Sequence, residues 1–365
     1  MQRVLQIIPT LDWAGGERQA CLLATRLPRD QFEVHVCALK GPGPLADELR
    51  EGDIPVTVVD QRSNLCLQAF WQFKEHLRQL RPELIHAWTT AANPLTQAAG
   101  EWCGLRRWII SQRCEPARQG CLARAFARLL RPGWQRIVVN NGDTRDACLR
   151  HGLPPESLHV VPHGVVLPEP PVTTRRQFLD QLGLPEEARV VGLVGRLSPE
   201  KRLKDAIWAL DLLKVIRDDV YLLVIGDGPL RDQLRRFRDK VLIHDKIHFL
   251  GPRNDLAQLL PHFDLLWSTA SSGGQSNAIL EAMAAGVAVV ATDISGTREL
   301  VISGTTGYLV AVGDRAGLAK YTERLLNRPA LAAQLAAAAR SRVARQFSVQ
   351  KMVDRYAELY RQANA

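Results

Sequence analysis

Short apolar runs recur along this chain, and glycine-containing turns and helical patterns separate many of them. The first run, Val4–Ile8, leads through a turn at Gly15 and Gly16 into a helical pattern from Glu17 to Leu27. This turn lacks the GxGxxG motif of dinucleotide sites, although its glycines allow a ligand to approach the backbone closely. Further strands of this first series are expected at Glu33–Leu39, Val56–Val59, Glu83–Ala87, Trp108–Ser111, Ile137–Asn140 and His159–Val161.

A second series begins after a stiff, proline-rich segment at residues 162–171, where we place the linker between two domains. Its strands are expected at Val190–Val194, Tyr221–Ile225, Ile247–Leu250, Phe263–Ser268, Val287–Thr292 and Gly307–Val310. Because strands alternate with helical patterns in both series, the sheets should be parallel and doubly wound. We therefore predict an α/β fold with two Rossmann-like domains, residues 1–165 and 172–345, that face each other across a cleft. A last helix within residues 346–365 should pack on a domain surface.

Composition agrees with this picture and excludes few functions. A length of 365 residues exceeds the usual range of one domain, and 46% hydrophobic residues can form a large core. The formal net charge of +9 fits polyanionic partners, phosphate-bearing substrates or an anionic membrane surface, and does not choose among them. No apolar run approaches the roughly 18–20 residues that span a bilayer, and no secretory signal is visible. We therefore expect a cytoplasmic protein, with attachment to the inner face of the membrane left open.

The sequence predicts no metal site. Its seven cysteines include no CxxC pair, the histidines are not clustered at ligand spacing, and no Asp-x-Asp pair occurs. We read the cysteines as reduced thiols that mostly contribute to packing. Any charge that develops on a phosphate would then have to be stabilised by fixed positive groups of the protein.

Two cations leave the end of a predicted strand together. Val190–Val194 runs into Gly195, Arg196 follows at once, and Lys201 comes five positions later. Arginine matches phosphate oxygens as a planar fork, while lysine acts as a mobile point charge. The functional interpretation is a diphosphate site, and the alternative is a charged surface turn.

Residues 268–299 supply a second candidate for phosphate binding. A small, polar loop that contains Gly273 leads through Ser276 into a predicted helix at Asn277–Ala285. Ser276, Asn277 and Ala278 would begin this helix, where unpaired backbone N–H groups and the helix dipole favour an anion. Glu281 follows about one turn later and could contact a polar group beside the anion. The alternative is an ordinary capped amphipathic helix.

Arginines crowd between residues 106 and 136. Arg124, Arg128 and Arg131 would share one face of a helix, and apolar residues would share another. The functional interpretation is peripheral contact of segment 106–136 with anionic lipid or with an anionic acceptor. The alternative is a solvated face above an ordinary core stripe.

Several of these motifs together resemble a known family. The order GLVGRLSPEKR, VIGDGPLRDQL, IHFLG and SNAILEAMAAGVAVVATDISGTRELV is similar to retaining, nucleotide-sugar-dependent glycosyltransferases of the GT-B fold, family 4 type. AGGERQ near the amino terminus and FSVQKMVDRYAELYR near the end are also similar to that family. The resemblance covers nearly the whole chain and is more specific in its second half.

The resemblance implies a role for each candidate residue. Arg196 and Lys201 would bind the donor diphosphate and act in catalysis, and Glu281 would bind the ribose hydroxyls. Gly15 and Gly16 would line the cleft, the base would lie near Gly251–Arg253, and the last helix would cross back to the first domain. The residues expected to bind the donor are Gly15, Gly16, Gly195, Ser276, Asn277, Ala278 and Glu281.

The resemblance also implies the partners. A nucleotide diphosphate sugar would be the co-substrate, a carbohydrate or lipid-linked molecule would be the acceptor, and neither a cofactor, a metal nor a nucleic acid would be needed. The expected activity is metal-independent transfer of a sugar to an acceptor hydroxyl with retention of configuration.

The sequence departs from the family pattern where the sugar would bind. Gly273 stands where the family has a glutamate, eight positions before Glu281, and Trp88 stands where a second histidine often follows the one at His86. The family's Pro-Asn-Gly-Val-Asp reads Pro162-His163-Gly164-Val165-Val166. A catalytically silent nucleotide- or glycan-binding protein is therefore an alternative. A sugar-nucleotide epimerase is a third hypothesis, although we find no pair of carboxylates suited to its acid–base chemistry.

Overall fold

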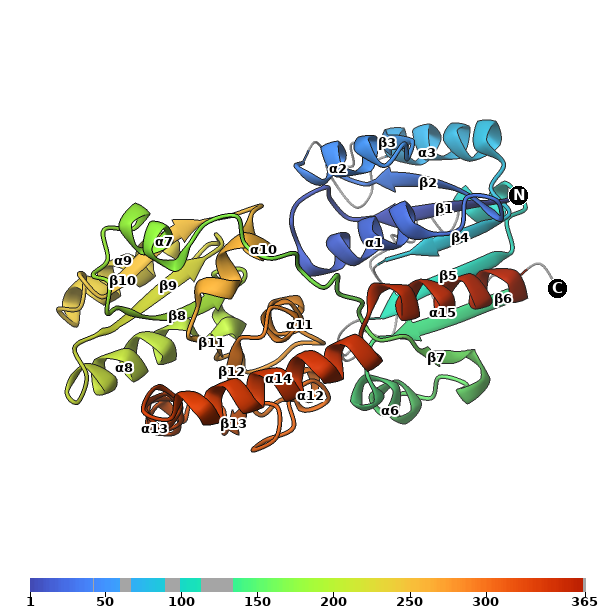
Figure 1. Cartoon of the computed structure of the whole chain (residues 1–365). Helices are drawn as coiled ribbons and strands as arrows, with labels where there is room; N and C mark the ends of the chain where they lie inside the picture. Colours follow the sequence, from blue (N-terminus) through green and yellow to red (C-terminus); the bar gives the residue numbers. More distant parts are fainter. Residues whose placement is uncertain (42, 60–66, 89–98, 113–133, 364–365) are drawn as a thin grey trace. The chain divides into compact units, whose positions relative to one another are not determined.

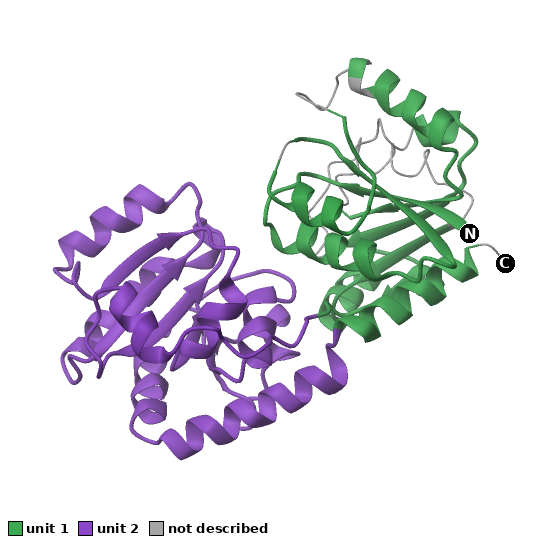
Figure 2. Cartoon of the chain, turned by 45° about the horizontal axis from the view of Figure 1, so that its top comes forward, with its two compact units in different colours: residues 1–164, 349–365 green, residues 165–348 purple. Residues whose placement is uncertain are grey.

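The structure is a computed structural model that describes residues 1–41, 43–59, 67–88, 99–112 and 134–363. It divides into two compact units (Figure 2), residues 1–164 with 349–365, and residues 165–348. Each unit is built on a parallel sheet with helices on both faces (Figure 1), so the predicted Rossmann-like α/β architecture is confirmed. The arginines Arg124, Arg128 and Arg131 of the predicted basic helix lie outside the described residues.

Unit 1 contains a seven-stranded sheet in the order β3-β2-β1-β4-β5-β6-β7. Its strands are β1 Gln2–Ile8, β2 Phe32–Ala38, β3 Val56–Val58, β4 Leu84–Ala87, β5 Arg107–Gln112, β6 Trp134–Val139 and β7 Leu158–Val160. Its helices are α1 Gly15–Arg26, α2 Leu45–Glu51, α3 Leu67–Leu80, α6 Gly142–Arg150, η1 Pro155–Ser157 and α15 Val349–Gln362.

Both faces of the unit 1 sheet are covered, which explains the continuous apolar run of β1. Val4 and Ile8 pack on one side with residues of α1 and α15, while Leu5 and Ile7 pack on the other side with Phe73 of α3. A half-buried sheet would instead show alternating polar residues. The last helix of the chain is thus part of the core of unit 1.

A buried hydrogen-bonded group ties α15 to the sheet. The Tyr360 hydroxyl lies 2.6 Å from His86 Nδ1, and His86 Nε2 lies 2.9 Å from the Ser111 hydroxyl. Burial, and then the neighbouring Tyr356, raises the pKa of Tyr360 well above its usual value, so its hydroxyl stays protonated. The phenol therefore takes part in this contact in its un-ionised form, inside the core.

We expect Tyr360→Phe to lower the free energy of unfolding by about 1–2 kcal/mol, because the buried imidazole loses a hydrogen bond. Urea unfolding followed by circular dichroism measures the change. Tyr321→Phe is the matched control, since the Tyr321 ring stacks on Tyr308 and its hydroxyl has no hydrogen bond among the described residues. Equal losses in the two variants would contradict the prediction.

Unit 2 contains a six-stranded sheet in the order β10-β9-β8-β11-β12-β13. Its strands are β8 Arg189–Val194, β9 Val220–Ile225, β10 Ile247–Gly251, β11 Leu265–Ser268, β12 Ala288–Thr292 and β13 Tyr308–Val310. Its helices are α7 Arg175–Gln181, η2 Pro199–Lys201, α8 Leu203–Lys214, α9 Arg231–Lys240, α10 Leu256–Leu259, η3 Leu260–His262, α11 Asn277–Ala284, α12 Ser295–Arg298, α13 Arg315–Leu326 and α14 Pro329–Gln346.

The order of the strands creates a switch point in unit 2. β8 pairs in parallel with β9 on one side and with β11 on the other, so the chain leaves β8 and β11 in opposite directions. Ligands of doubly wound sheets bind at the carboxyl ends of the strands at such a point. The loops after β8 and β11 are therefore the place to look for a site.

Candidate functional site

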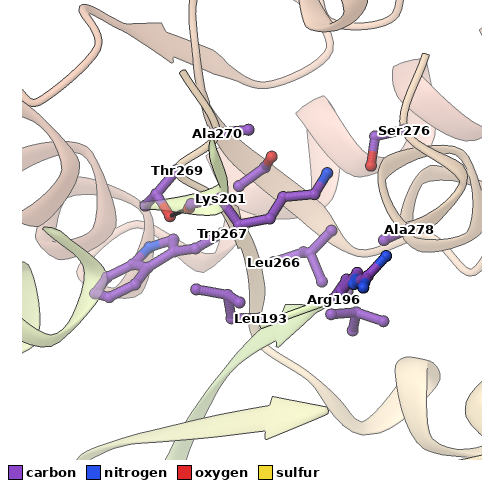
Figure 3. Close-up of a pocket in the computed structure, with 12 residues that line it drawn as sticks. Leu193, Arg196, Lys201, Leu266, Trp267, Thr269, Ala270, Ser276 and Ala278 are labelled. Carbon is purple, nitrogen blue, oxygen red and sulfur yellow. Dashed lines mark hydrogen bonds between the residues drawn. The ribbon is translucent and has the colours of Figure 1, made fainter. Parts of the chain in front are cut away.

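A pocket lies where β8 and β11 end, at the switch point of unit 2 (Figure 3). It is lined by Leu193, Val194, Gly195, Arg196, Lys201, Leu266, Trp267, Ser268, Thr269, Ala270, Ser276 and Ala278. Five of the residues proposed from the sequence to bind or act on a donor are thus brought together: Gly195, Arg196, Lys201, Ser276 and Ala278. The pocket combines an apolar floor from the strand ends with a polar and cationic rim.

Arg196 and Lys201 supply the positive charge of this rim. Arg196 is exposed and Lys201 is half-buried. Figure 3 shows both side chains extended toward the side of the pocket where Ser276 and Ala278 lie. Within the described part of the chain, no carboxylate lies within 4.0 Å of either cation, so both are available to an anionic ligand.

The amino terminus of α11 forms the opposite side of the rim. Ser276 is the N-cap, and its hydroxyl accepts a hydrogen bond from the Ile279 N–H at 3.4 Å. Ile279, Leu280 and Met283 bury the apolar face of the helix in the core of unit 2, which fixes the direction of its axis. The positive end of the helix dipole therefore reinforces Arg196 and Lys201.

Glu281 and Asn277 lie in the first turns of α11 but are not among the residues that line the pocket. Both are half-buried, and both take part in interactions with other residues. The roles predicted for them, contact with the ribose and with the donor, stay predictions.

The loop after β11 holds the lysine turn in place, a feature that the sequence did not reveal. The Thr269 hydroxyl donates to the Lys201 carbonyl at 2.8 Å, and the Ser271 N–H donates to the Glu200 carbonyl at 2.8 Å. Only the position of these residues just after a strand of the switch point could have marked them. They join the two loops into one rim.

Glu200 is the carboxylate nearest to the two cations in sequence. A hydrogen bond from the Ser198 hydroxyl, with smaller contributions from Lys201 and Arg196, holds the pKa of Glu200 below its usual value. The side chain is exposed and ionised at neutral pH. It moderates the positive potential of the rim without forming an ion pair there.

The backbone at the pocket depends on glycine. Gly195 has φ +146° and Gly226, at the end of β9, has φ +130°. A Cβ at Gly226 would lie 2.1 Å from the Gly195 carbonyl oxygen. The end of β9 therefore approaches the pocket loop so closely that only glycine fits at position 226.

Gly273 also adopts a conformation that side chains rarely take, with φ +141°, although a Cβ there would meet no atom within 4 Å. The start of α12 packs closely against this loop, since a Cβ at Gly296 would lie 2.0 Å from the Gly274 carbonyl oxygen. A glutamate, which the resemblance implied at this position, would adopt this backbone conformation only with strain.

The remaining sequence candidates belong to unit 1 or to the end of β10. Gly15 and Gly16 begin α1 in unit 1. Gly251 ends β10 with φ +73°, and the Arg253 guanidinium pairs with the Asp255 carboxylate. None of the four lines the pocket.

Trp88 lies in the core of unit 1. Its ring is 3% exposed and stacks on His86 with the ring centroids 4.5 Å apart. Its indole N–H donates to the Gln6 side-chain oxygen at 2.9 Å. The tryptophan therefore contributes to packing at a position where the resemblance implied a histidine near the sugar.

The sequence also led to expectations about metal ligands, membrane-spanning helices and cysteines, and the described residues bear on each. In that part of the chain, no three histidine, cysteine or acidic side chains come together as a set of metal ligands. No described helix has both the length and the apolar composition that crossing a membrane requires. Four of the seven cysteines lie in the described ranges and are free thiols, and burial raises the pKa of Cys21 and Cys37 to about 12 each.

Two protein-family models match this chain, one after the other. Residues 13–168 match the model described as Glycosyltransferase Family 4, and residues 174–342 match the model described as Glycosyl transferases group 1. The boundary between the two matches falls in the proline-rich linker, next to the boundary between unit 1 and unit 2. Each match thus falls almost entirely within one compact unit, and α15 of unit 1 lies outside both matches.

Curated relatives are similar at modest identity. A Bacillus anthracis N-acetyl-alpha-D-glucosaminyl L-malate synthase is 29% identical over 213 residues, which cover 54% of this chain and 55% of that protein. The chain thus spans about half the length of that relative. An Escherichia coli UDP-Gal:alpha-D-GlcNAc-diphosphoundecaprenol alpha-1,3-galactosyltransferase is 22% identical over 98% of this chain and 95% of its own length.

Solved structures share the fold over the full length. Anabaena Alr3699/HepE in complex with UDP-glucose superimposes with a TM-score of 0.87 at 22% identity, covering 99% of this chain and 100% of that one. WaaG, a glycosyltransferase involved in lipopolysaccharide biosynthesis, gives a TM-score of 0.76 at 18% identity over 98% and 99% of the two chains. Each of the two family models matches just under half of the chain, and together with the shared fold they support a GT-B glycosyltransferase of the family 4 type.

Proposed function

We propose that this protein transfers a sugar from a nucleoside diphosphate sugar to an acceptor hydroxyl, with retention at the anomeric carbon and without a metal. The observation that supports the proposal is the convergence of Arg196, Lys201 and the amino terminus of α11 on one pocket at the switch point. Three positive groups on one rim match the two phosphates of such a donor.

In the proposed reaction, the bond between the anomeric carbon and the diphosphate breaks while the acceptor oxygen forms a bond to that carbon. The acceptor attacks on the face from which the diphosphate leaves, and the departing phosphate oxygen takes the proton of the hydroxyl. Arg196, Lys201 and the N–H groups of α11 stabilise the negative charge that grows on the diphosphate. This role needs groups that are already oriented before the reaction begins.

Uridine diphosphate sugars are the first donors to test. The Anabaena protein was crystallised with UDP-glucose, and the E. coli relative is named for UDP-galactose and a diphosphoundecaprenol-linked acceptor. By analogy, we propose a carbohydrate or lipid-linked acceptor for this chain. Peripheral membrane contact through segment 106–136 stays a prediction, because residues 113–133 lie outside the described ranges.

A donor screen tests the proposal. We expect one class of nucleoside diphosphate sugar to raise the melting temperature of the protein in a concentration-dependent way and to be consumed when an acceptor is added, in the presence of EDTA. Matching nucleoside monophosphates are the control, because they lack the second phosphate. Failure of every donor and every free nucleoside diphosphate to bind would overturn the proposal.

A catalytically silent nucleotide-binding protein is the second candidate. Gly273, which provides no side chain where the family has a glutamate, and the buried Trp88 are the observations that favour it. The same screen separates the two, since the silent protein would bind a nucleoside diphosphate sugar but release no nucleotide with any acceptor.

A further inference from the structure

Arg202 adopts a backbone conformation that is costly for its residue type. Its φ of 49° and ψ of 40° place it in the left-handed region, which glycine enters readily and other residues enter at a cost. Arg202 ends the short helix η2 and is the N-cap of α8, so it directly follows Lys201 of the pocket rim. The direction in which Lys201 leaves the turn depends on this conformation.

A buried carboxylate holds Arg202. Asp205, in the first turn of α8, has a side chain that is 7% exposed, and its Oδ2 accepts a hydrogen bond from Arg202 Nε at 2.6 Å. Its Oδ1 accepts a second one from Arg315 Nε, at the start of α13, at 2.8 Å. Asp205 thus bridges two arginines from different helices, and neither arginine lines the pocket.

The lysine turn therefore has two supports on opposite sides. Thr269 and Ser271 bind the carbonyls of Lys201 and Glu200 from the pocket side. Asp205 binds the side chain of the next residue from the α8 side. Without the second support, the turn can relax toward a conformation that an arginine prefers, and Lys201 would then leave the pocket rim.

We propose that Asp205 is a positioning residue for the diphosphate site: it stabilises the left-handed conformation of Arg202 and so holds the Lys201 ammonium at the pocket. The proposal rests on the proposed function, because it assumes that Lys201 binds the donor diphosphate. If Asp205 served only to join α8 and α13, the identity of residue 202 would not affect diphosphate binding once the carboxylate is removed.

Glycine at position 202 distinguishes the positioning role of Asp205 from a role confined to joining α8 and α13. Glycine adopts the left-handed conformation without the hydrogen bond from residue 202 to Asp205, which we call the clamp. The experiment compares wild type with Asp205→Ala, Arg202→Gly and the double variant Arg202→Gly/Asp205→Ala. The affinity for UDP, GDP and ADP is measured by calorimetry, and melting temperatures are measured in parallel. Asp211→Asn is the matched control, since it removes a carboxylate from the same helix that forms no ion pair among the described residues.

We expect Asp205→Ala to weaken binding of the preferred diphosphate about tenfold, and the double variant to bind within about threefold of wild type. Arg202→Gly alone and Asp211→Asn should bind like wild type. A double variant as weak as Asp205→Ala would overturn the proposal. If Asp205→Ala does not fold, Asp205→Asn takes its place, because the amide oxygen still accepts a hydrogen bond from Arg202 but carries no charge. Asp205→Asn should lose less diphosphate affinity than Asp205→Ala, and adding Arg202→Gly must restore that affinity.

The failure of this proposal is distinguishable from the failure of the proposed function. If wild type binds none of the three nucleoside diphosphates, the proposed function fails, and the clamp is then judged from crystal structures of the variants. Residue 202 in Asp205→Ala should have left the left-handed region, with Lys201 displaced, and should keep it in the double variant. An unchanged Lys201 in the Asp205→Ala crystal would overturn the clamp by itself.

Discussion

Lys201→Ala should lower kcat for sugar transfer by roughly 100- to 1,000-fold, the loss seen when one preorganised group is removed from a developing negative charge. Lys201 is half-buried, lines the pocket at the end of η2, and has no carboxylate within ion-pair distance among the described residues. Its ammonium is thus available to the leaving diphosphate. Arg196→Ala should lose less, because the Arg196 side chain is exposed and water screens its charge.

The measurement is initial rates with the donor identified in the screen, at saturating acceptor, together with donor affinity from calorimetry. Arg236→Ala is the matched control, since Arg236 is an exposed cation of α9 in the same unit and does not line the pocket. Lys201→Arg tests whether charge alone is sufficient at this position. Unchanged rate and affinity in both Lys201→Ala and Arg196→Ala would remove the diphosphate site from this pocket.

The sheets of both units could be predicted because their strands are buried on two faces. Val190–Val194 and Tyr221–Ile225 are uninterrupted apolar runs, and the structure gives β8 and β9 the same ends with one further residue at each start. Such runs, alternating with helical patterns, leave few alternatives to a parallel sheet. The meeting of Arg196 and Lys201 with α11 followed from the rule that loops after neighbouring parallel strands lie together.

The support of the site could not be predicted in this way. A run such as PEKRLKD reads as an ordinary charged turn, so the left-handed conformation of Arg202 could not be predicted, and the second contact of Asp205, with Arg315, depends on the packing of α8 against α13. The surroundings of Trp88 show the same limit. The resemblance marked this position only as one where the family often has a histidine near the sugar, and the packing of Trp88 on His86 and its hydrogen bond to Gln6 could not be read from the sequence.

Gly226→Ala should strongly destabilise unit 2, with a loss of about 3 kcal/mol or more in the free energy of unfolding. The reason is a clash within the backbone. A Cβ at Gly226 would lie 2.1 Å from the Gly195 carbonyl oxygen, and no flexible side chain can move to relieve that contact. Gly195 directly precedes Arg196, so the strain would displace the cationic rim, and donor affinity should fall along with stability.

Gly273→Ala isolates the effect of the clash from the effect of backbone strain. The two glycines have similar φ values, +130° at Gly226 and +141° at Gly273, but a Cβ at Gly273 would meet no atom within 4 Å. Gly273→Ala should therefore cost only the strain of an unfavourable conformation, about 1–3 kcal/mol. Urea unfolding of the two variants side by side measures the difference. If they lose equal stability, the approach of β9 to Gly195 is not what requires glycine at position 226, and the rim is less rigid than the packing at Gly226 implies.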